Sequence, residues 1–190
     1  MCANPFAILI SQTGDGPFAT HLPLHVDEKE EKVFLRGHVA KANPHWRHLE
    51  QHPQCLTIFH GPHSYISPSN YTAYESVPTW NYAAVHAYGE ARLFSAEQDV
   101  HAMLGELMET FEPEYRMQWE DLSPKYRDNM LRQIVGFEIA VTKIEGKFKL
   151  SQNRTREDQA NVIASLEKAE DSAVSGVARM MKEQDLGKKE

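Results

Sequence analysis

A group of residues suited to binding an anion lies where a predicted strand gives way to a predicted helix. Five of them fall within eight positions: Arg36, Gly37, His38, Lys41 and Asn43. Asn43 followed by Pro44 is typical of a helix N-terminus, whose free backbone N–H groups and partial positive charge attract anions. We expect this turn either to bind a phosphate group or to be an ordinary strand-to-helix turn with surface charges.

A second group combines aromatic rings with amide and hydroxyl groups. Trp80 and Asn81 stand in the aromatic run at residues 77–82, and residues 60–65 upstream have a similar character. A flat heteroaromatic ligand needs aromatic faces for stacking and polar groups for its edge. The alternative is a packed aromatic core.

A third group follows a predicted strand near the end of the chain and is polar throughout. Its members include Lys149, Ser151, Gln152 and Arg154. These side chains could reach a ligand, or they could serve as ordinary cap and turn residues.

Metal binding and nucleophilic catalysis have weaker signals. His45, His48 and His52 have helical spacing, but no carboxylate or cysteine is placed to complete a metal shell, so we expect no metal. Cys55 lies in an apolar run, which favours a buried structural role. The sequence has no G-x-S-x-G elbow and no glycine-rich nucleotide loop, and we assign no catalytic residue.

Composition limits the class of protein. The 190 residues amount to about one domain, and 20 Lys and Arg against 27 Asp and Glu give a net charge of −7, which disfavours generic DNA binding. Two distant cysteines do not make a disulfide framework, and no apolar run approaches the roughly 18 residues of a membrane span. We therefore expect a cytoplasmic protein without a membrane segment.

The pattern of elements favours an α+β fold built around an antiparallel β-barrel with peripheral helices. Alternating or apolar runs predict strands at residues 4–11, 18–26, 32–39, 55–60, 83–93 and 137–142. Helices are predicted at residues 44–51, 95–111, 124–133 and 155–169. We expect a domain at residues 1–169 and a frayed or helical tail at residues 170–190.

Three local signals refine these boundaries. Ser95 and Gln98 have the spacing of a capping box, and Thr155 is placed to cap the last predicted helix. The turn at residues 145–146 predicts that residues 147–150 pair back as a hairpin.

Five ordered segments resemble the PaiB family. They are residues 17–24, 35–44, 58–69, 77–89 and 146–154, and the most distinctive read GHVAKANP, PTWNY and KLSQNR. The resemblance implies an FMN-binding protein with the split β-barrel fold of the pyridoxamine-phosphate oxidases, acting as a negative transcriptional regulator. It also implies a homodimer that holds the flavin at its interface.

The resemblance implies a role for each group of residues. His38, Lys41 and Asn43 would lie near the FMN phosphate, beside Arg36 and Gly37. The strand carrying Thr20, His21, Leu22 and Pro23 would follow the edge of the isoalloxazine ring. Trp80 and Asn81 would wall that ring or bond its pyrimidine side. Lys149, Ser151, Gln152 and Arg154 would reach in from the partner subunit. Family members carry a further segment before the first strand, and we expect its contacts to be absent here.

Three functions remain open at this stage. The first is regulation through flavin or partner binding, because the predicted helices in residues 95–134 are too acidic to favour direct DNA contact. The second is an FMN-dependent oxidase or reductase, in which His21, His38 or His86 could move protons. The third is a haem-binding split barrel, which the phosphate-binding character of the Lys41 segment disfavours.

Overall fold

The computed structural model describes residues 1–186. The chain divides into two compact units, which we call unit 1 (residues 1–59 and 86–145) and unit 2 (residues 60–85 and the chain from residue 146 onward). Among residues 1–186, no helix combines the length and the apolar content needed to cross a membrane.

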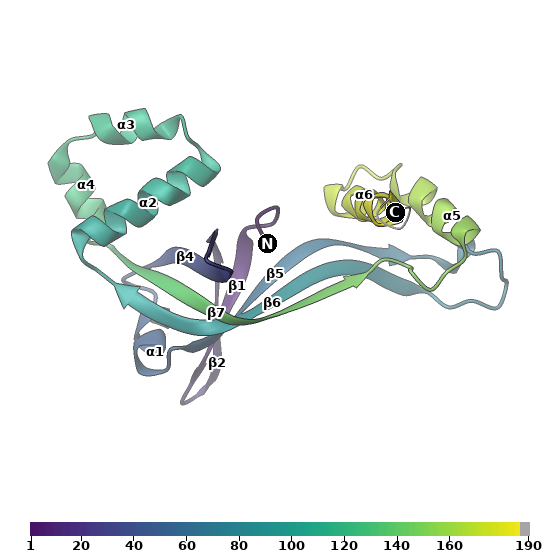
Figure 1. Cartoon of the computed structure of the whole chain (residues 1–190), viewed down its shortest axis with the longest axis horizontal. Coiled ribbons are helices and arrows are strands. Elements are labelled where there is room, and N and C mark those ends of the chain that lie inside the picture. Colours follow the sequence, from purple (N-terminus) through teal and green to yellow (C-terminus); the bar gives the residue numbers. More distant parts are fainter. Residues whose placement is uncertain (187–190) are drawn as a thin grey trace. The chain divides into compact units, whose positions relative to one another are not determined.

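Seven strands form one sheet with the order β2-β1-β5-β6-β7-β4-β3. The strands are β1 (Phe6–Thr13), β2 (Gly16–Pro23), β3 (His25–Lys29), β4 (Lys32–Ala40), β5 (Gln54–Ile66), β6 (Thr79–Phe94) and β7 (Ile134–Lys149). The edge strands β2 and β3 follow one another along the chain, and the described hydrogen bonds do not close the sheet between them. An antiparallel sheet left open in this way is a split barrel, which confirms the predicted fold class (Figure 1).

Alternation along the strands builds the core of unit 1. In β1, Ala7, Leu9 and Ser11 are buried, whereas Ile8 and Ile10 between them are only half-buried. Phe59, Phe137 and other inward-facing side chains complete the interior. Full burial of one such side chain stabilises the fold by about 1.5–3 kcal/mol.

Four helices belong to unit 1. They are α1 (His45–Gln51), α2 (Glu97–Phe111), α3 (Tyr115–Asp121) and α4 (Pro124–Leu131). Figure 1 shows α2, α3 and α4 as one group, and a shared apolar cluster of Val100, Met103, Leu107, Trp119 and Leu131 holds them together. The predicted helices at α1, α2 and α4 are confirmed, whereas α3 is a helix that the sequence analysis missed.

The predicted capping box at Ser95 is wrong. Helix α2 begins at Glu97 with Ala96 as its N-cap, and no side chain caps it. Ser123 does cap α4, because its hydroxyl accepts a hydrogen bond from the backbone N–H of Tyr126. Glu97 and Asp99 lie in the first turn of α2, where their negative charges interact favourably with the helix dipole.

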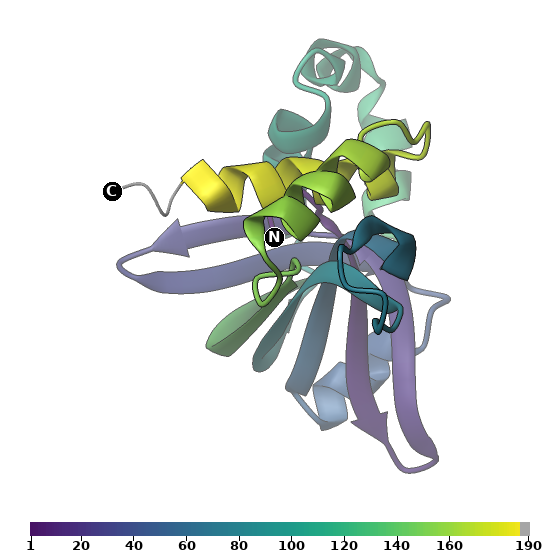
Figure 2. The ribbon, with the colours of Figure 1, turned by 90° about the vertical axis from the view of Figure 1, so that its right-hand side faces the viewer.

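Unit 2 contains the outer parts of β5, β6 and β7, a short 3-10 helix η1 (Pro68–Asn70), and helices α5 (Arg156–Leu166) and α6 (Ser172–Leu186). Helices α5 and α6 lie side by side (Figure 2). They share an apolar cluster that includes Ile66, Leu150, Val162 and Val177. The division into a domain at residues 1–169 and a separate tail stays a prediction.

Two predictions for unit 2 have different outcomes. Thr155 caps α5 as expected, because its hydroxyl accepts from the backbone N–H of Asp158 at 3.1 Å. The predicted hairpin at residues 145–150 is wrong, because β7 runs without a break from Ile134 to Lys149. Gly146 continues the extended backbone of the strand and makes no turn there.

Candidate functional site

A buried polar network fixes the turn between β4 and α1. Asn43 Nδ2 donates a hydrogen bond to Thr20 Oγ1 (3.1 Å), and His45 Nδ1 lies 2.8 Å from the same hydroxyl. Asn43 Oδ1 accepts from the backbone N–H of His45 at 3.0 Å. Burial, with a smaller contribution from His48, lowers the pKa of His45 to about 4, so its ring is neutral at pH 7. Thr20 and Asn43 are therefore engaged in holding the turn.

Lys41 is the exposed cation of this turn. Its backbone N–H donates to the carbonyl of Gln133 (2.7 Å), and its carbonyl accepts from Trp46 Nε1 (3.0 Å). Its side chain borders a pocket of about 240 Å³ that Glu97, Asp128 and Arg132 also line. The backbone of Lys41 is thus anchored on two sides, and its ammonium group extends to the surface.

Arg36 is committed to carboxylates. Its Nε donates to Glu138 Oε2 (2.7 Å), and its Nη1 donates to Glu106 Oε1 (2.6 Å). Burial opposes ionisation of Glu138, but hydrogen bonds from Arg36 and Arg92 outweigh it and hold the pKa of Glu138 below its usual value. We therefore leave Arg36 out of the phosphate ligands proposed below.

The sequence analysis missed the partner of Arg36, although a signal was present. Glu138 alternates with the buried Phe137 and Ile139 along β7, so it faces the other side of the sheet. Arg36 and Glu138 then stand directly opposite each other in the β4–β7 register. The β4–β7 register brings Arg36 and Glu138 together, and this register cannot be read from the sequence.

Gly37 and His38 are neighbours on β4 with different roles. A Cβ at position 37 would lie 2.7 Å from Leu24 Cδ2 and 3.3 Å from the backbone oxygen of Pro23, so close packing requires glycine there. Burial lowers the pKa of His38. Its Nδ1 is buried and has no hydrogen-bond partner within residues 1–186. Such an atom is one that a bound group or water would satisfy.

The other predicted residues of β2 differ in exposure. Leu22 is buried in the core, whereas His21 and Pro23 are exposed. The ring centroid of His21 lies 6.3 Å from that of Phe6. His21 is therefore the β2 side chain that can meet a ligand, and Leu22 offers only its backbone.

In unit 2, Asn81 and Ser151 form a buried pair. Asn81 is fully buried, and its Nδ2 donates to Ser151 Oγ at 2.9 Å. Ser151 has a φ of +60°, a left-handed conformation that few non-glycine residues adopt. The hydrogen bond to Asn81 holds this strained residue in place at the end of β7.

The residues flanking Ser151 are fixed by the same turn. Lys149 Nζ donates to Thr79 Oγ1. Gln152 closes the turn, because its Oε1 accepts from the backbone N–H of Leu150 (2.8 Å) and its Nε2 donates to the carbonyl of Phe148 (2.6 Å). The structure thus brings Lys149, Ser151 and Gln152 together with residues 79–81 of the same chain.

Two aromatic contacts lie in the same unit. The Arg154 guanidinium lies 3.8 Å above the ring centroid of Tyr71, a cation–π contact. Trp80 is 53% exposed, with Tyr65 edge-on at 6.2 Å and His63 at 6.3 Å between ring centroids. Thr79 and Tyr71 were not predicted from the sequence, because hydroxyl and aromatic residues in a loop-like stretch carry no specific signal.

These donor groups fit FMN. Within unit 2, Lys149 and Arg154 carry the positive charge that a phosphate monoester attracts, and within unit 1 Lys41 carries such a charge. The exposed indole of Trp80 in unit 2 offers a flat apolar face. The orphaned Nδ1 of His38 adds a buried polar atom without a partner.

Thiol and metal chemistry find little support in the described structure. Burial raises the pKa of the Cys55 thiol to about 12, and its Sγ contacts the carbonyl of Gly89 at 3.6 Å, so it stays protonated. Within residues 1–186, no three histidine, cysteine or acidic side chains converge as metal ligands would.

Comparison with known proteins places the chain in a family. Residues 1–143 match the family described as "Putative FMN-binding domain". The chain is 39% identical over 182 residues to Protease synthase and sporulation protein PAI 2 of Bacillus subtilis, covering 95% of this chain and 87% of that protein. It is 30% identical over 222 residues to an uncharacterized protein of Emericella nidulans, covering 95% and 88%.

Solved structures agree on the fold. The flavocytochrome Anf3 from Azotobacter vinelandii superimposes with a TM-score of 0.57 at 19% identity, over 83% of this chain and 68% of that one. The FAD and Heme binding protein from Mycobacterium smegmatis gives 0.57 at 14% identity, over 84% and 73%. The chain therefore belongs to the FMN-binding family that the PaiB resemblance indicated, it has the split-barrel fold, and its cofactor is FMN.

Proposed function

We propose that this protein binds FMN between two copies of itself and acts as a flavin-dependent negative regulator of transcription. The observation that carries the proposal is the arrangement in unit 2, where Lys149, the Asn81–Ser151 pair and the exposed Trp80 are held by one turn and its neighbouring strand. Lys149 offers positive charge and Trp80 offers a flat face, and the buried Asn81–Ser151 pair keeps the turn in shape.

In this proposal each group has a separate task. Lys41 attracts the phosphate, the half-buried His38 contributes a polar atom near the Lys41 turn, and Lys149 and Arg154 reach in from the partner subunit. Trp80 packs against the flavin ring, and the strand with Thr20, His21, Leu22 and Pro23 follows its edge. Asn81, Ser151 and Gln152 keep the turn in shape. When bound, FMN supplies one- and two-electron transfer, and the protein supplies orientation and electrostatics.

An uncovered sheet face in unit 1 supports the homodimer. Ile8 stands opposite Ile58, and Ile10 stands opposite Leu56, in the β1–β5 register. All four side chains are only half-buried, and Phe6 beside them is 62% exposed. An apolar face of this kind is typical of a surface that a second subunit covers.

The regulatory output is proposed to depend on flavin redox state or on a protein partner. The related PAI 2 protein is named for protease synthesis and sporulation. Helices α2 to α4 carry a surplus of carboxylates, which would repel the DNA backbone: Glu97, Asp99, Glu106, Glu109, Glu120, Asp121 and Asp128. Cys2 and Cys55 are both free thiols, which supports a cytoplasmic location.

A second candidate is an FMN-dependent oxidase or reductase. The observation that favours it is the exposed imidazole of His21 on β2, a side chain of the type that enzymes use as a general acid or base. Oxygen uptake with a reduced nicotinamide or a pyridoxal-like amine would favour this function over regulation.

The test is an absorption spectrum of the purified protein, with mass analysis of the released small molecule and light scattering on the same sample. We expect flavin bands, the mass of FMN and the size of a dimer. Protein that stays colourless after soaking in excess FMN would overturn the proposal, and a Soret band would replace flavin by haem.

A further inference from the structure

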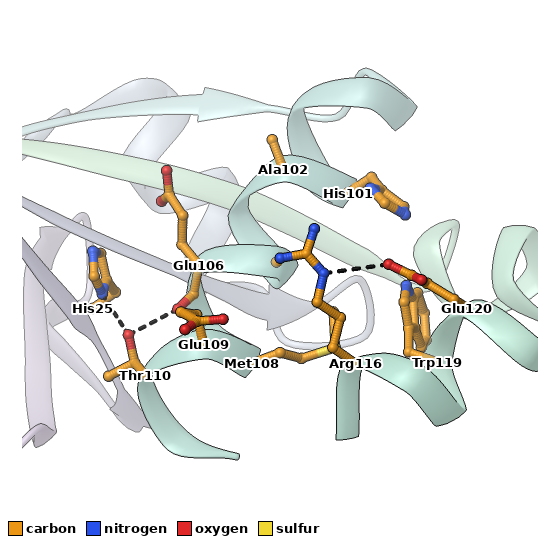
Figure 3. A pocket seen from close by; sticks show the side chains of 11 residues that line it. His25, His101, Ala102, Glu106, Met108, Glu109, Thr110, Arg116, Trp119 and Glu120 are labelled. Atoms are coloured by element: carbon orange, nitrogen blue, oxygen red, sulfur yellow. Dashed lines mark hydrogen bonds and ion pairs between the residues drawn. The ribbon is translucent and has the colours of Figure 1, made fainter. Parts of the chain in front are cut away.

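A cavity of about 470 Å³ lies in unit 1, and none of the residues assigned to FMN above lines it. It is bordered by α2, α3 and the start of β3 (Figure 3). Small-molecule sites in proteins commonly measure 300–1,000 Å³. The size therefore suits a ligand of one or two rings.

A glycine inside α2 leaves room in this cavity. Gly105 lines the cavity in the middle of a 15-residue helix, where glycine is among the least favourable residues. A Cβ built at Gly105 would meet no heavy atom within 4 Å, so packing does not require glycine there. The packing of neighbouring side chains does not explain this glycine. Space for a ligand would explain it.

Two buried polar atoms at the cavity lack partners. Trp119 is 7% exposed, and its indole Nε1 is buried without a hydrogen-bond acceptor within residues 1–186. Glu106 pairs through Oε1 with Arg36, but its Oε2 is buried without a donor in the same part of the chain. The orphaned indole N–H of Trp119 indicates a ligand that carries an acceptor, whereas the Glu106 carboxylate is engaged by Arg36.

His25 provides a further acceptor. The Thr110 hydroxyl donates its proton to the carbonyl of Glu106 (2.8 Å), so His25 Nδ1, 2.8 Å from Thr110 Oγ1, must be the donor in that contact. In the tautomer that donates from Nδ1, Nε2 is the acceptor nitrogen. Figure 3 shows this hydrogen-bonded chain with Glu109 beside it.

The charges around the cavity favour a cation. Arg116 pairs with Glu120 (3.3 Å), and Glu106 pairs with Arg36 (2.6 Å). Glu109 has no ion-pair partner within 4 Å in residues 1–186 and leaves a negative charge at the His25 end. The Trp119 end, beside Glu120, instead offers an N–H donor.

We propose that this cavity is a second binding site, distinct from the FMN site, for a small aromatic alkylammonium ion. The ammonium group lies near Glu109 and His25 Nε2, the ring packs along Gly105 and Met108, and an oxygen at the far end accepts from Trp119 Nε1. A hydroxylated phenylethylamine has each of these features.

The test uses titration calorimetry of the purified full chain with three probes. We expect tyramine to bind. Phenethylamine, which lacks the oxygen, binds about threefold to tenfold more weakly, the ratio for one lost hydrogen bond. 3-(4-Hydroxyphenyl)propionate, whose charge is reversed, binds at least about tenfold more weakly than tyramine. No saturable binding of tyramine, or equal binding of the carboxylate, would overturn the proposal.

Substitutions at one position tie binding to this cavity. Gly105→Leu fills it, so tyramine binding is lost, whereas Gly105→Ala keeps most of the space and retains binding. Both variants keep the flavin spectrum and the thermal midpoint of the wild type or raise the midpoint, because each replaces a helix glycine. Unchanged tyramine binding in Gly105→Leu contradicts the assignment.

A second pair of variants tests the charge without altering the cavity shape. Glu109→Gln removes the unpaired carboxylate and weakens tyramine binding several-fold. Glu112→Gln, an exposed residue just beyond the end of α2 that does not line the cavity, leaves it unchanged. If both variants weaken tyramine binding equally, the binding depends on general surface charge, and the proposed site is wrong.

Discussion

Single residues decide which charges are free to meet a phosphate. Arg36 and Lys41 stand close in sequence and look alike as candidate ligands, but Arg36 is held by Glu138 and Glu106, whereas the Lys41 ammonium extends to the surface. Charge alone therefore does not identify a ligand. A charged side chain is a candidate ligand only if it is not already paired with carboxylates, as Arg36 is.

Lys41→Ala is expected to weaken FMN binding by about 1.5–3 kcal/mol, the contribution of a hydrogen bond to a charged group. The thermal midpoint of the apoprotein should not move, because the side chain is exposed. Fluorescence titration of apoprotein with FMN measures the change. Lys125→Ala, an exposed lysine on α4, is the control, and retained affinity in Lys41→Ala would remove this residue from the site.

Trp80→Ala is expected to change flavin fluorescence and weaken FMN binding, because the exposed indole would no longer pack against the ring. Trp80→Phe should keep most of the affinity. Steady-state fluorescence of the bound flavin compares the two. If only the thermal midpoint moves, Trp80 has a structural role alone.

His45 makes stability depend on pH. Its pKa is about 4 in the folded protein and about 6.5 when unfolded, so the unfolded chain takes up the proton first. The free energy of unfolding should therefore fall as pH drops from 6.5 towards 4, by on the order of 3 kcal/mol in total. Urea denaturation at several pH values measures the slope. His45→Gln should flatten it, and a variant of the exposed His52 should not.

At the scale of elements, caps and alternation were predictable where the signal is local. Thr155 and Ser123 cap their helices through bonds to residues three positions away, and the alternation along β7 places Phe137 and Ile139 on its core face. The capping box at Ser95 is a local signal that failed. The other errors arose where distant contacts decide. Sheet pairing keeps β7 extended through Gly146, and the apolar cluster around Trp119 stabilises the seven-residue α3.

Thr155→Ala should destabilise the protein by about 1 kcal/mol, the usual value for a lost N-cap. The hydroxyl accepts from the N–H of Asp158, whose carboxylate in turn accepts from the backbone N–H of Thr72 at 2.8 Å. Urea denaturation measures the change. Thr155→Ser keeps the acceptor and should recover most of the stability, and equal loss in both variants would exclude the capping role.

At the scale of the whole molecule, assembly cannot be read from one sequence. The half-buried Ile8, Ile10, Leu56 and Ile58 are ordinary strand residues until the β1–β5 register gathers them on one uncovered face. The resemblance to PaiB predicted FMN and the fold, both of which are confirmed. The dimer and the individual ligands stay predictions because they depend on contacts outside one chain.

Ile58→Asp should yield a monomer by light scattering and reduce FMN binding, because a buried charge at a subunit interface is strongly unfavourable. Met117→Asp provides a matched control, since Met117 is an 81% exposed apolar residue on α3. A dimer that survives Ile58→Asp would move the subunit contact elsewhere.

The three strands that serve both units have a consequence for how this protein can be dissected. The polypeptide passes from one unit to the other at residues 59–60, 85–86 and 145–146, each time in the middle of a strand. A single cut of the chain would therefore not separate unit 1 from unit 2, because each unit consists of two separate segments. Swapping a unit between relatives requires three splices, each matched in register to the strand it interrupts.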